Sequence, residues 1–192
     1  MNRRLFSATV IAFVFVSLVT LNVRAQDTFN VDLSHSGILF KVDHLGFSYV
    51  YGRFNEFTGE IKFDPAKLDK SRLELTIKTA SVDTNDEKRD QHLRSADFFN
   101  AKQFPTATFK SKSFKKAGSK YHVTGDLTLN GKTKSITTEF SVIGKGKDPW
   151  GGYRIGGEAE LVVKRSDFGI NYMPDALGED VKILISIQAI RK

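Results

Sequence analysis

Residues 121–142 read YHVTGDLTLNGKTKSITTEFSV, and the pattern of this stretch decides the fold class. Apolar or small side chains alternate with polar ones along both halves, at Tyr121, Val123, Gly125, Leu127 and Leu129 and again at Ile136, Thr138, Phe140 and Val142. A period of two is typical of a β-strand with one buried face. Between the halves, Asn130-Gly131 is the preferred two-residue turn of a β-hairpin. The stretch therefore predicts two antiparallel strands.

The same alternation recurs on both sides of this hairpin, over residues 38–42, 57–63, 73–77, 153–163 and 181–189. Phe54 is out of phase with the second of these segments, which predicts a bulge near Asn55-Glu56. We find no alternation of strands with long helices, no internal repeat and no linker. The chain is therefore expected to be one all-β domain of about eight antiparallel strands, which must stack as two sheets or close into a barrel.

One segment departs from the strand pattern. Thr84 and Glu87 have the spacing of a capping box, and residues 88–96 suit a helix of two to three turns. Asp90 and Arg94 could then pair one turn apart. Two phenylalanines follow directly, at 98 and 99. A single short helix that ends in two aromatic residues is most simply a plug or lid over one end of the fold.

The N-terminal 25 residues have the layout of a secretory signal peptide. Arg3 and Arg4 begin it, an apolar stretch follows, and Val23-Arg24-Ala25 supplies small residues before a cut at Gln26. An uncleaved membrane anchor is the alternative, because 19 residues nearly span a bilayer. With cleavage, residues 26–192 form the mature domain, which we expect to work in the periplasm without membrane insertion. The chain has no cysteine, so its core alone must hold it together.

Composition and motifs exclude several kinds of chemistry. Residues 1–25 hold three of the 29 basic residues and none of the 22 acidic ones, so only a slight positive excess remains and nucleic acid is not an expected partner. The lysines at 110, 112, 115, 116 and 120 are predicted to bracket a solvated hairpin turn. Residues 125–133 lack the spacing of a phosphate-binding loop, and the four histidines lack metal-ligand spacing. No cofactor or metal is expected, and the pattern favours a container over a catalyst.

Motifs in order along the mature chain resemble the YceI-like family, also described as polyisoprenoid-binding periplasmic proteins. They are His35-Ser36 with Phe40, Val42, His44 and Gly46, then Gly52-x-Phe54-x-x-Phe57-x-Gly59, Ser81-Val82-Asp83-Thr84, Arg89-Asp90-x-His92-Leu93, Asp97-Phe98-Phe99, Phe104-Pro105, Gly125-x-Leu127-Thr128-Leu129-x-Gly131-x-Thr133, Asp148-Pro149-Trp150-Gly151, Arg165-x-Asp167-Phe168-Gly169 and Gly178-Glu179-Asp180-Val181. Each motif is weak alone, and their shared order makes the resemblance specific.

The resemblance implies an extended, eight-stranded, lipocalin-like antiparallel barrel with one short helix. It also implies a carrier that holds a long-chain isoprenoid, such as a polyprenol or quinone, or a similar amphiphile in its interior. We expect the lipid chain to contact Phe40, Val42, Phe57, Ile61, Leu75, Leu127, Phe140 and Ile155, with Phe98 and Phe168 near a mouth. Arg89 and His92, with His44 as a further donor, are the expected contacts of the head group. An ion pair of Arg89 with Asp83, Asp90 or Asp97 is the alternative.

Two other classes of function stay open at the level of sequence. One is an enzyme that modifies the bound lipid with His44 or His92 acting beside Asp90. The other is a secreted structural or interaction protein whose barrel interior is filled by its own side chains, as eight-stranded barrels allow. A homodimer is compatible with each of these classes.

Overall fold

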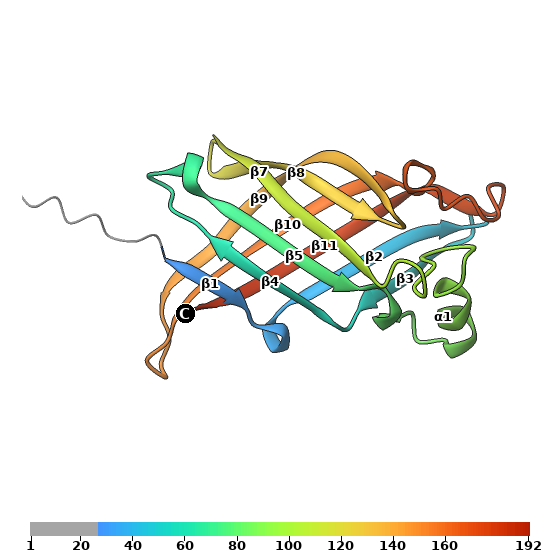
Figure 1. The fold of residues 1–192 in the computed structure, drawn as a ribbon, viewed down its shortest axis with the longest axis horizontal. Coiled ribbons are helices and arrows are strands. Elements are labelled where there is room, and N and C mark those ends of the chain that lie inside the picture. The colour runs from blue at the N-terminus through green and yellow to red at the C-terminus, as the bar shows by residue number, and fades with distance from the viewer. Residues whose placement is uncertain (1–26) are drawn as a thin grey trace, which may run out of the picture.

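The computed structural model describes residues 27–192, so the signal peptide predicted over residues 1–25 lies outside the described residues. Eleven β-segments and one α-helix make up the fold (Figure 1). The segments are β1 (Thr28–Val31), β2 (Gly37–His44), β3 (Ser48–Phe54), β4 (Phe57–Lys62), β5 (Arg72–Lys78), β6 (Val82–Asp83), β7 (Thr106–Ala117), β8 (Lys120–Leu129), β9 (Lys132–Lys147), β10 (Tyr153–Lys164) and β11 (Leu177–Arg191), with α1 at Glu87–Leu93 and short 3₁₀ turns at Leu33–His35, Leu68–Lys70, Thr79–Ser81 and Arg165–Phe168.

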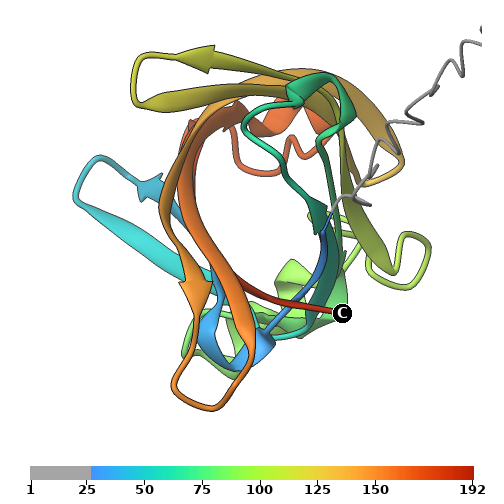
Figure 2. The ribbon, with the colours of Figure 1, turned by 90° about the vertical axis from the view of Figure 1, so that its left-hand side faces the viewer.

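The eleven segments occupy eight strand positions, because three long strands are each interrupted once. The segments β1 and β2 form one strand position, and both pair with β11. The next position is formed by β4, which pairs with β1, and β3, which pairs with β2. The third is formed by β5, which pairs with β4, and β6, which pairs with β3. From there each strand pairs with its successor along the chain, through to β11. Pairing of the last strand with the first closes the sheet into an antiparallel up-and-down barrel, which Figure 2 shows from one end. The all-β prediction and the eight-stranded barrel are confirmed.

The local sequence accounts for one of these interruptions and for the β8–β9 hairpin turn. The break between β3 and β4 falls at Asn55-Glu56, where the phase of the apolar residues predicted a bulge. The turn between β8 and β9 lies at Asn130-Gly131, with φ of 49° and 72°, which are the left-handed angles that asparagine and glycine tolerate best. Tyr121 pairs with Phe140 across this hairpin, as the alternation requires. The stretch that decides the fold class is thus a hairpin in the predicted register.

The five lysines bracket the β7–β8 hairpin turn, as predicted, but four of them lie within the strand β7 rather than in a loop. Lys110 and Lys112 lie within the 12-residue strand β7, and the turn to β8 is confined to Gly118-Ser119. Ala107, Phe109 and Phe114 on the other face of this strand are buried. Lys110 and Lys112 thus lie on the solvent-facing side of a strand whose alternate residues are buried.

The helix α1 is shorter than predicted and begins two residues later than a Thr84 cap would place it. Asp86 is the N-cap, and its carboxylate accepts from the Arg89 N–H at 2.9 Å. Thr84 instead donates its hydroxyl to buried Asp90 at 2.6 Å. The predicted pairing of Asp90 with Arg94 is therefore wrong: Arg94 donates to the carbonyl oxygens of Ala80 and Val82. These bonds anchor α1 to the wall of the barrel.

The side chain of Asp32 stabilises the turn that separates β1 from β2. Its carboxylate accepts from the Ser34 hydroxyl at 2.6 Å and from Arg154 at 2.9 Å, and it contacts His35 at 2.8 Å. These donors, with the Ser34 bond the largest cause, lower the pKa of Asp32 far below its ordinary value. Arg154 also donates to Asp148 at 2.6 Å, so one guanidinium ties the interruption to the β9–β10 loop.

We predict that Asp32→Asn lowers the melting temperature at neutral pH by about 3–6 °C. Since the pKa of Asp32 is lower in the folded chain, its carboxylate stabilises the fold fully above its ordinary pKa near 4. That contribution shrinks as the pH falls toward the folded-state pKa. The difference in melting temperature from wild type should therefore be constant above about pH 5 and narrow as the pH falls below about 4. Asp175→Asn, at an exposed loop position, is the control; a difference for Asp32→Asn that is constant with pH would contradict this account.

Candidate functional site

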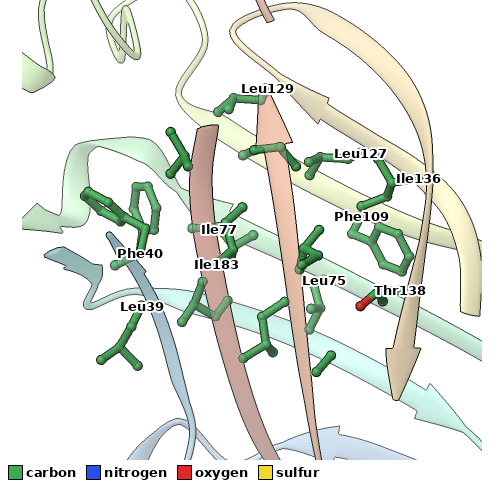
Figure 3. A pocket seen from close by; sticks show the side chains of 18 of the residues that line it. Leu39, Phe40, Leu75, Ile77, Phe109, Leu127, Leu129, Ile136, Thr138 and Ile183 are labelled. Carbon is green, nitrogen blue, oxygen red and sulfur yellow. The ribbon is translucent and has the colours of Figure 1, made fainter. Parts of the chain in front are cut away.

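A cavity of ≈ 190 Å³ lies inside the barrel. Inward-facing side chains of almost every strand line it, because alternate residues of each strand share the inner face. Figure 3 labels ten of the lining residues, with Phe40 on one side of the space and Phe109 and Ile136 across from it. The lining also includes Val42, Phe54, Ile61, Leu73, Leu75, Ile77, Leu127, Leu129, Phe140, Ala159, Leu161, Val163, Val181, Ile183, Ile185 and Ile187. An eight-stranded barrel can thus retain free space in its interior.

The lining is apolar with two exceptions, Thr138 and Arg165. The Thr138 hydroxyl donates to the backbone oxygen of Glu160 at 3.0 Å, so it already has a partner in the wall. The Arg165 guanidinium likewise already donates to backbone oxygens of the protein. A ligand inside the barrel therefore meets carbon rather than free donors or acceptors. Such a cavity favours a hydrocarbon chain, because a polar ligand would lose its hydrogen bonds to water.

Aromatic residues close the end of the barrel that holds both termini of the described chain (Figure 1). Phe29 is fully buried, with its ring centroid 6.3 Å from that of Tyr153. Phe63 lies 5.0 Å from Tyr121 and 6.1 Å from Phe114. Phe63 and Phe114 also line the cavity. Phe63 and Phe114 therefore form the floor of the cavity.

Two segments cover the opposite end. The segment that contains α1 contributes Leu93, Phe98 and Phe99, and the β10–β11 loop contributes Phe168 and Ile170. The segments meet in a cluster in which the His92 ring lies 5.0 Å from Phe98 and 4.9 Å from Tyr172. The cavity therefore has a floor of strand residues and a cover of loop and helix residues, consistent with the lid predicted from the sequence.

Arg165 organises the β10–β11 half of this cover. Its side chain is 6% exposed, and it donates five hydrogen bonds to backbone oxygens. The acceptors are Ile170, Tyr172, Met173, Leu177 and Gly178, at 2.8–3.4 Å. All five N–H donors of the guanidinium are thus directed to the β10–β11 loop and the first two residues of β11. The cation lies at the cavity, yet its donors hold the loop and are not free for a ligand.

The structure brings eight of the predicted site residues together in the lining. They are Phe40, Val42, Ile61, Leu75, Phe98, Leu127, Phe140 and Phe168. Phe57 and Ile155 are buried at 5% and 2% exposure but lie in packed core away from the cavity. Contact of these ten residues with a lipid remains a prediction.

The three predicted head-group residues lie outside the cavity lining. Arg89 donates to the hydroxyl and the backbone oxygen of Thr84, each at 2.7 Å, rather than to one of the three carboxylates weighed as partners. His92 hydrogen-bonds to Asp97 at 2.8 Å. His44 is half-buried at the end of β2, paired with Ser48 and Leu177. His92 therefore has a structural partner in Asp97. The pairing of a histidine with Asp90, on which the enzyme alternative depended, is not formed, because Asp90 accepts from Thr84 instead.

Sequence reasoning missed several lining residues. Phe109 and Phe114 belong to β7, and Phe54 and Phe99 form an aromatic group with Phe40 at centroid distances of 5.4–6.5 Å. The alternation of residues 107–111 could have identified Phe109. Nothing in the sequence pattern marks Arg165 as a cavity residue, because its position depends on the folding of a loop around it.

Neighbouring aromatic rings occupy the space beside two inward-facing glycines. A Cβ at Gly52 would lie 2.3 Å from the Phe40 ring, and one at Gly157 would lie 2.3 Å from the Phe140 ring. The glycines let these rings lie against the wall, which leaves the centre of the barrel free.

Within residues 27–192, no group of three or more His, Cys, Asp or Glu side chains is placed to hold a metal ion. The same residues include no helix that is both long enough and apolar enough to cross a bilayer.

A closed antiparallel barrel around an apolar cavity, with a floor and a cover, defines the class of small lipocalin-like binding barrels. Residues 29–189 match the YceI-like domain, and the chain belongs to the YceI-like family. It is 41% identical over 186 residues to Protein YceI of Salmonella agona, and this match covers 95% of this chain and 97% of that protein.

Two solved structures share the fold. The crystal structure of BcnA from Burkholderia cenocepacia has a TM-score of 0.76 and 30% sequence identity, and the match covers 82% of this chain and 98% of that one. A polyisoprenoid-binding domain from Saccharophagus degradans, implicated in plant cell wall breakdown, has a TM-score of 0.67 and covers 85% of this chain and 98% of that domain. At 17% identity, the second likeness concerns the fold alone.

Proposed function

We propose that this protein is a periplasmic carrier that binds a long-chain isoprenoid of the polyprenol or quinone type, or a similar amphiphilic lipid, inside its barrel. The observation that carries the proposal is the cavity whose lining is apolar apart from two hydrogen-bonded side chains. The family membership and the polyisoprenoid-binding domain of the same fold support it. Export to the periplasm rests on the signal peptide predicted over residues 1–25.

Burial of hydrocarbon supplies the binding energy. Each CH₂ group moved from water into the cavity contributes about 0.8 kcal/mol. Even a short segment of an isoprenoid chain therefore offsets part of the entropy lost on association. The protein needs no directed polar contact for this, and the chain length rather than the head group would set the affinity.

The size of the cavity indicates how binding proceeds. At ≈ 190 Å³ it is smaller than the roughly 300–1,000 Å³ of pockets that hold drug-sized ligands. Many lining side chains, Leu127, Leu129, Ile136 and Ile183 among them, are only half-buried because they face free space rather than each other. They can change rotamer without displacing packed neighbours. We expect a long chain to enter by such rearrangement and to widen the space that is now free.

The carrier function predicts that a bound prenyl lipid is recovered unchanged. Residues 26–192, stripped of lipid with organic solvent, would be incubated with a radiolabelled polyprenol or quinone and then extracted. Stoichiometric recovery of the starting compound supports the proposal. Conversion of the compound, abolished by His92→Ala, would establish an enzyme instead, and failure to retain any label would indicate an interaction protein.

A further inference from the structure

Two neighbouring turns at the covered end of the barrel display apolar side chains to solvent. Phe47, in the β2–β3 turn, is 89% exposed, and Leu45 beside it is 50% exposed. In the β10–β11 loop, Met173 and Tyr172 are 45% and 37% exposed. A hydrogen bond of 2.8 Å from the Leu45 N–H to the Ala176 oxygen joins the two turns. We call these four residues the apolar tip.

The backbone of the apolar tip is in an unusual conformation. Five residues other than glycine have positive φ within residues 27–192, and three of them are asparagines, which tolerate it. The other two are Leu45 at 58° and Met173 at 48°. Long apolar side chains are rarely found with this backbone, and such outliers persist only where the surroundings enforce them. Both outliers therefore lie in the same pair of turns, and both are exposed.

The surroundings hold both turns in place. The Asp43 carboxylate accepts from the Gly46 N–H at 2.8 Å, and Phe47 donates its N–H to His44 at 3.1 Å. The Met173 oxygen accepts from Arg165 at 3.4 Å and from the Leu177 N–H at 3.0 Å. The apolar side chains are thus presented on rigid supports, at the expense of a strained backbone and of exposed apolar surface.

We propose that the apolar tip docks on the surface of a lipid bilayer, so that the covered end of the barrel faces the membrane. The inference rests on the proposed function, because a lipid carrier must exchange its ligand with a bilayer. The β10–β11 loop carries Tyr172 and Met173 of the apolar tip and also the cavity residues Phe168 and Ile170. The docking surface is therefore continuous with the cover of the cavity. Figure 1 shows the β2–β3 turn and this loop at the end where α1 lies.

The chemistry of the apolar tip selects a bilayer over a charged protein surface. Residues 44–49 read HLGFSY and residues 170–174 read INYMP, so the segments that carry the apolar tip contain no lysine, arginine or carboxylate. The charged residues next to them along the chain, Asp43 and Asp175, are acidic, so the apolar tip offers no cation to an anionic lipid. Exposed apolar turns that carry aromatic rings suit the interface of a fluid bilayer. Binding should therefore depend on apolar insertion and should not require anionic lipids.

The test is co-sedimentation of residues 26–192, which contain every strand of the barrel, with phosphatidylcholine vesicles. The triple variant Leu45→Asn, Phe47→Ser and Met173→Asn should bind at least about tenfold more weakly, because three inserted apolar side chains are lost. Asparagine accepts positive φ, so this variant should melt no lower than wild type. Wild-type binding should change less than about twofold between low and high salt, since exposed charges are screened but apolar contacts are not.

The matched control is Trp150→Ser with Ile143→Ser. These residues are 83% and 68% exposed and lie in the β9–β10 loop and in β9, away from the apolar tip. Equal loss of binding in the control, or wild-type protein that stays in the supernatant, would overturn the docking proposal. If the unsedimented wild type still carries a lipid by native mass spectrometry, docking alone fails and the carrier function stands. A concentration-dependent dimer lost in the triple variant, without vesicle binding, would assign the tip to a second copy of the chain.

Discussion

Replacing Arg165 with methionine is expected to lower the free energy of unfolding by more than about 3 kcal/mol. The guanidinium donates to five backbone oxygens in the β10–β11 loop and at the start of β11, and methionine offers none of these donors. Buried oxygens left without partners each cost about 1–3 kcal/mol unless water reaches them. The loop that carries Phe168 and Ile170 should then loosen, and the cover of the cavity with it.

Denaturant unfolding of Arg165→Met and Arg165→Lys would measure this effect. Lysine keeps the positive charge but has three N–H donors, so we expect a loss of stability between those of wild type and the methionine variant. Lys164→Met, at the exposed neighbouring position, controls for the removal of a basic residue. A loss below about 1 kcal/mol for Arg165→Met would show that the loop does not depend on this side chain.

Filling the cavity should separate binding from stability. Ala159 is half-buried, lines the cavity and lies in register between Phe140 and Ile185. Phenylalanine at this position would take up much of the free space. Displacing only two CH₂ groups of a bound chain removes about 1.6 kcal/mol of binding free energy. We therefore expect Ala159→Phe to weaken prenyl-lipid binding by more than about tenfold.

The stability of Ala159→Phe should stay within about 1 kcal/mol of wild type, because the new ring enters free space rather than a filled core. Equilibrium binding of a fluorescent prenyl lipid and denaturant unfolding measure the two quantities on the same preparation. Glu158→Phe places the same ring on the outer face of β10 and should leave binding unchanged. Unaltered affinity in Ala159→Phe would mean that the lipid binds elsewhere.

The barrel could be predicted from the sequence because its signal is local. Alternation over residues 121–142 and the Asn130-Gly131 turn specify a hairpin, and similar segments on both sides leave an antiparallel sheet as the only consistent arrangement. Closure was implied by family resemblance rather than by alternation, since two stacked sheets would show the same period. It becomes visible only in the pairing of β1 and β2 with β11.

The sequence predicts which strand residues face the interior, but not which of them border free space. Inward-facing strand residues such as Phe40 and Leu127 follow from the period of two, but the same period also selects Phe57 and Ile155, which pack in the core. Alternation identifies the inner face and not the place where packing leaves space. Arg89 was predicted as a head-group contact from its residue type and its place in the predicted helix, and its bond to Thr84 depends on the conformation of the loop before α1.

Native mass spectrometry of the mature protein, purified without detergent from the cell envelope that makes it, tests the carrier function most directly. We predict one additional mass of several hundred daltons per chain, released on denaturation and identified as a prenyl lipid. Ala159→Phe prepared in the same way should lack this mass. A bare protein mass that remains bare after incubation with quinones and polyprenols would contradict the proposal that the barrel carries such a lipid.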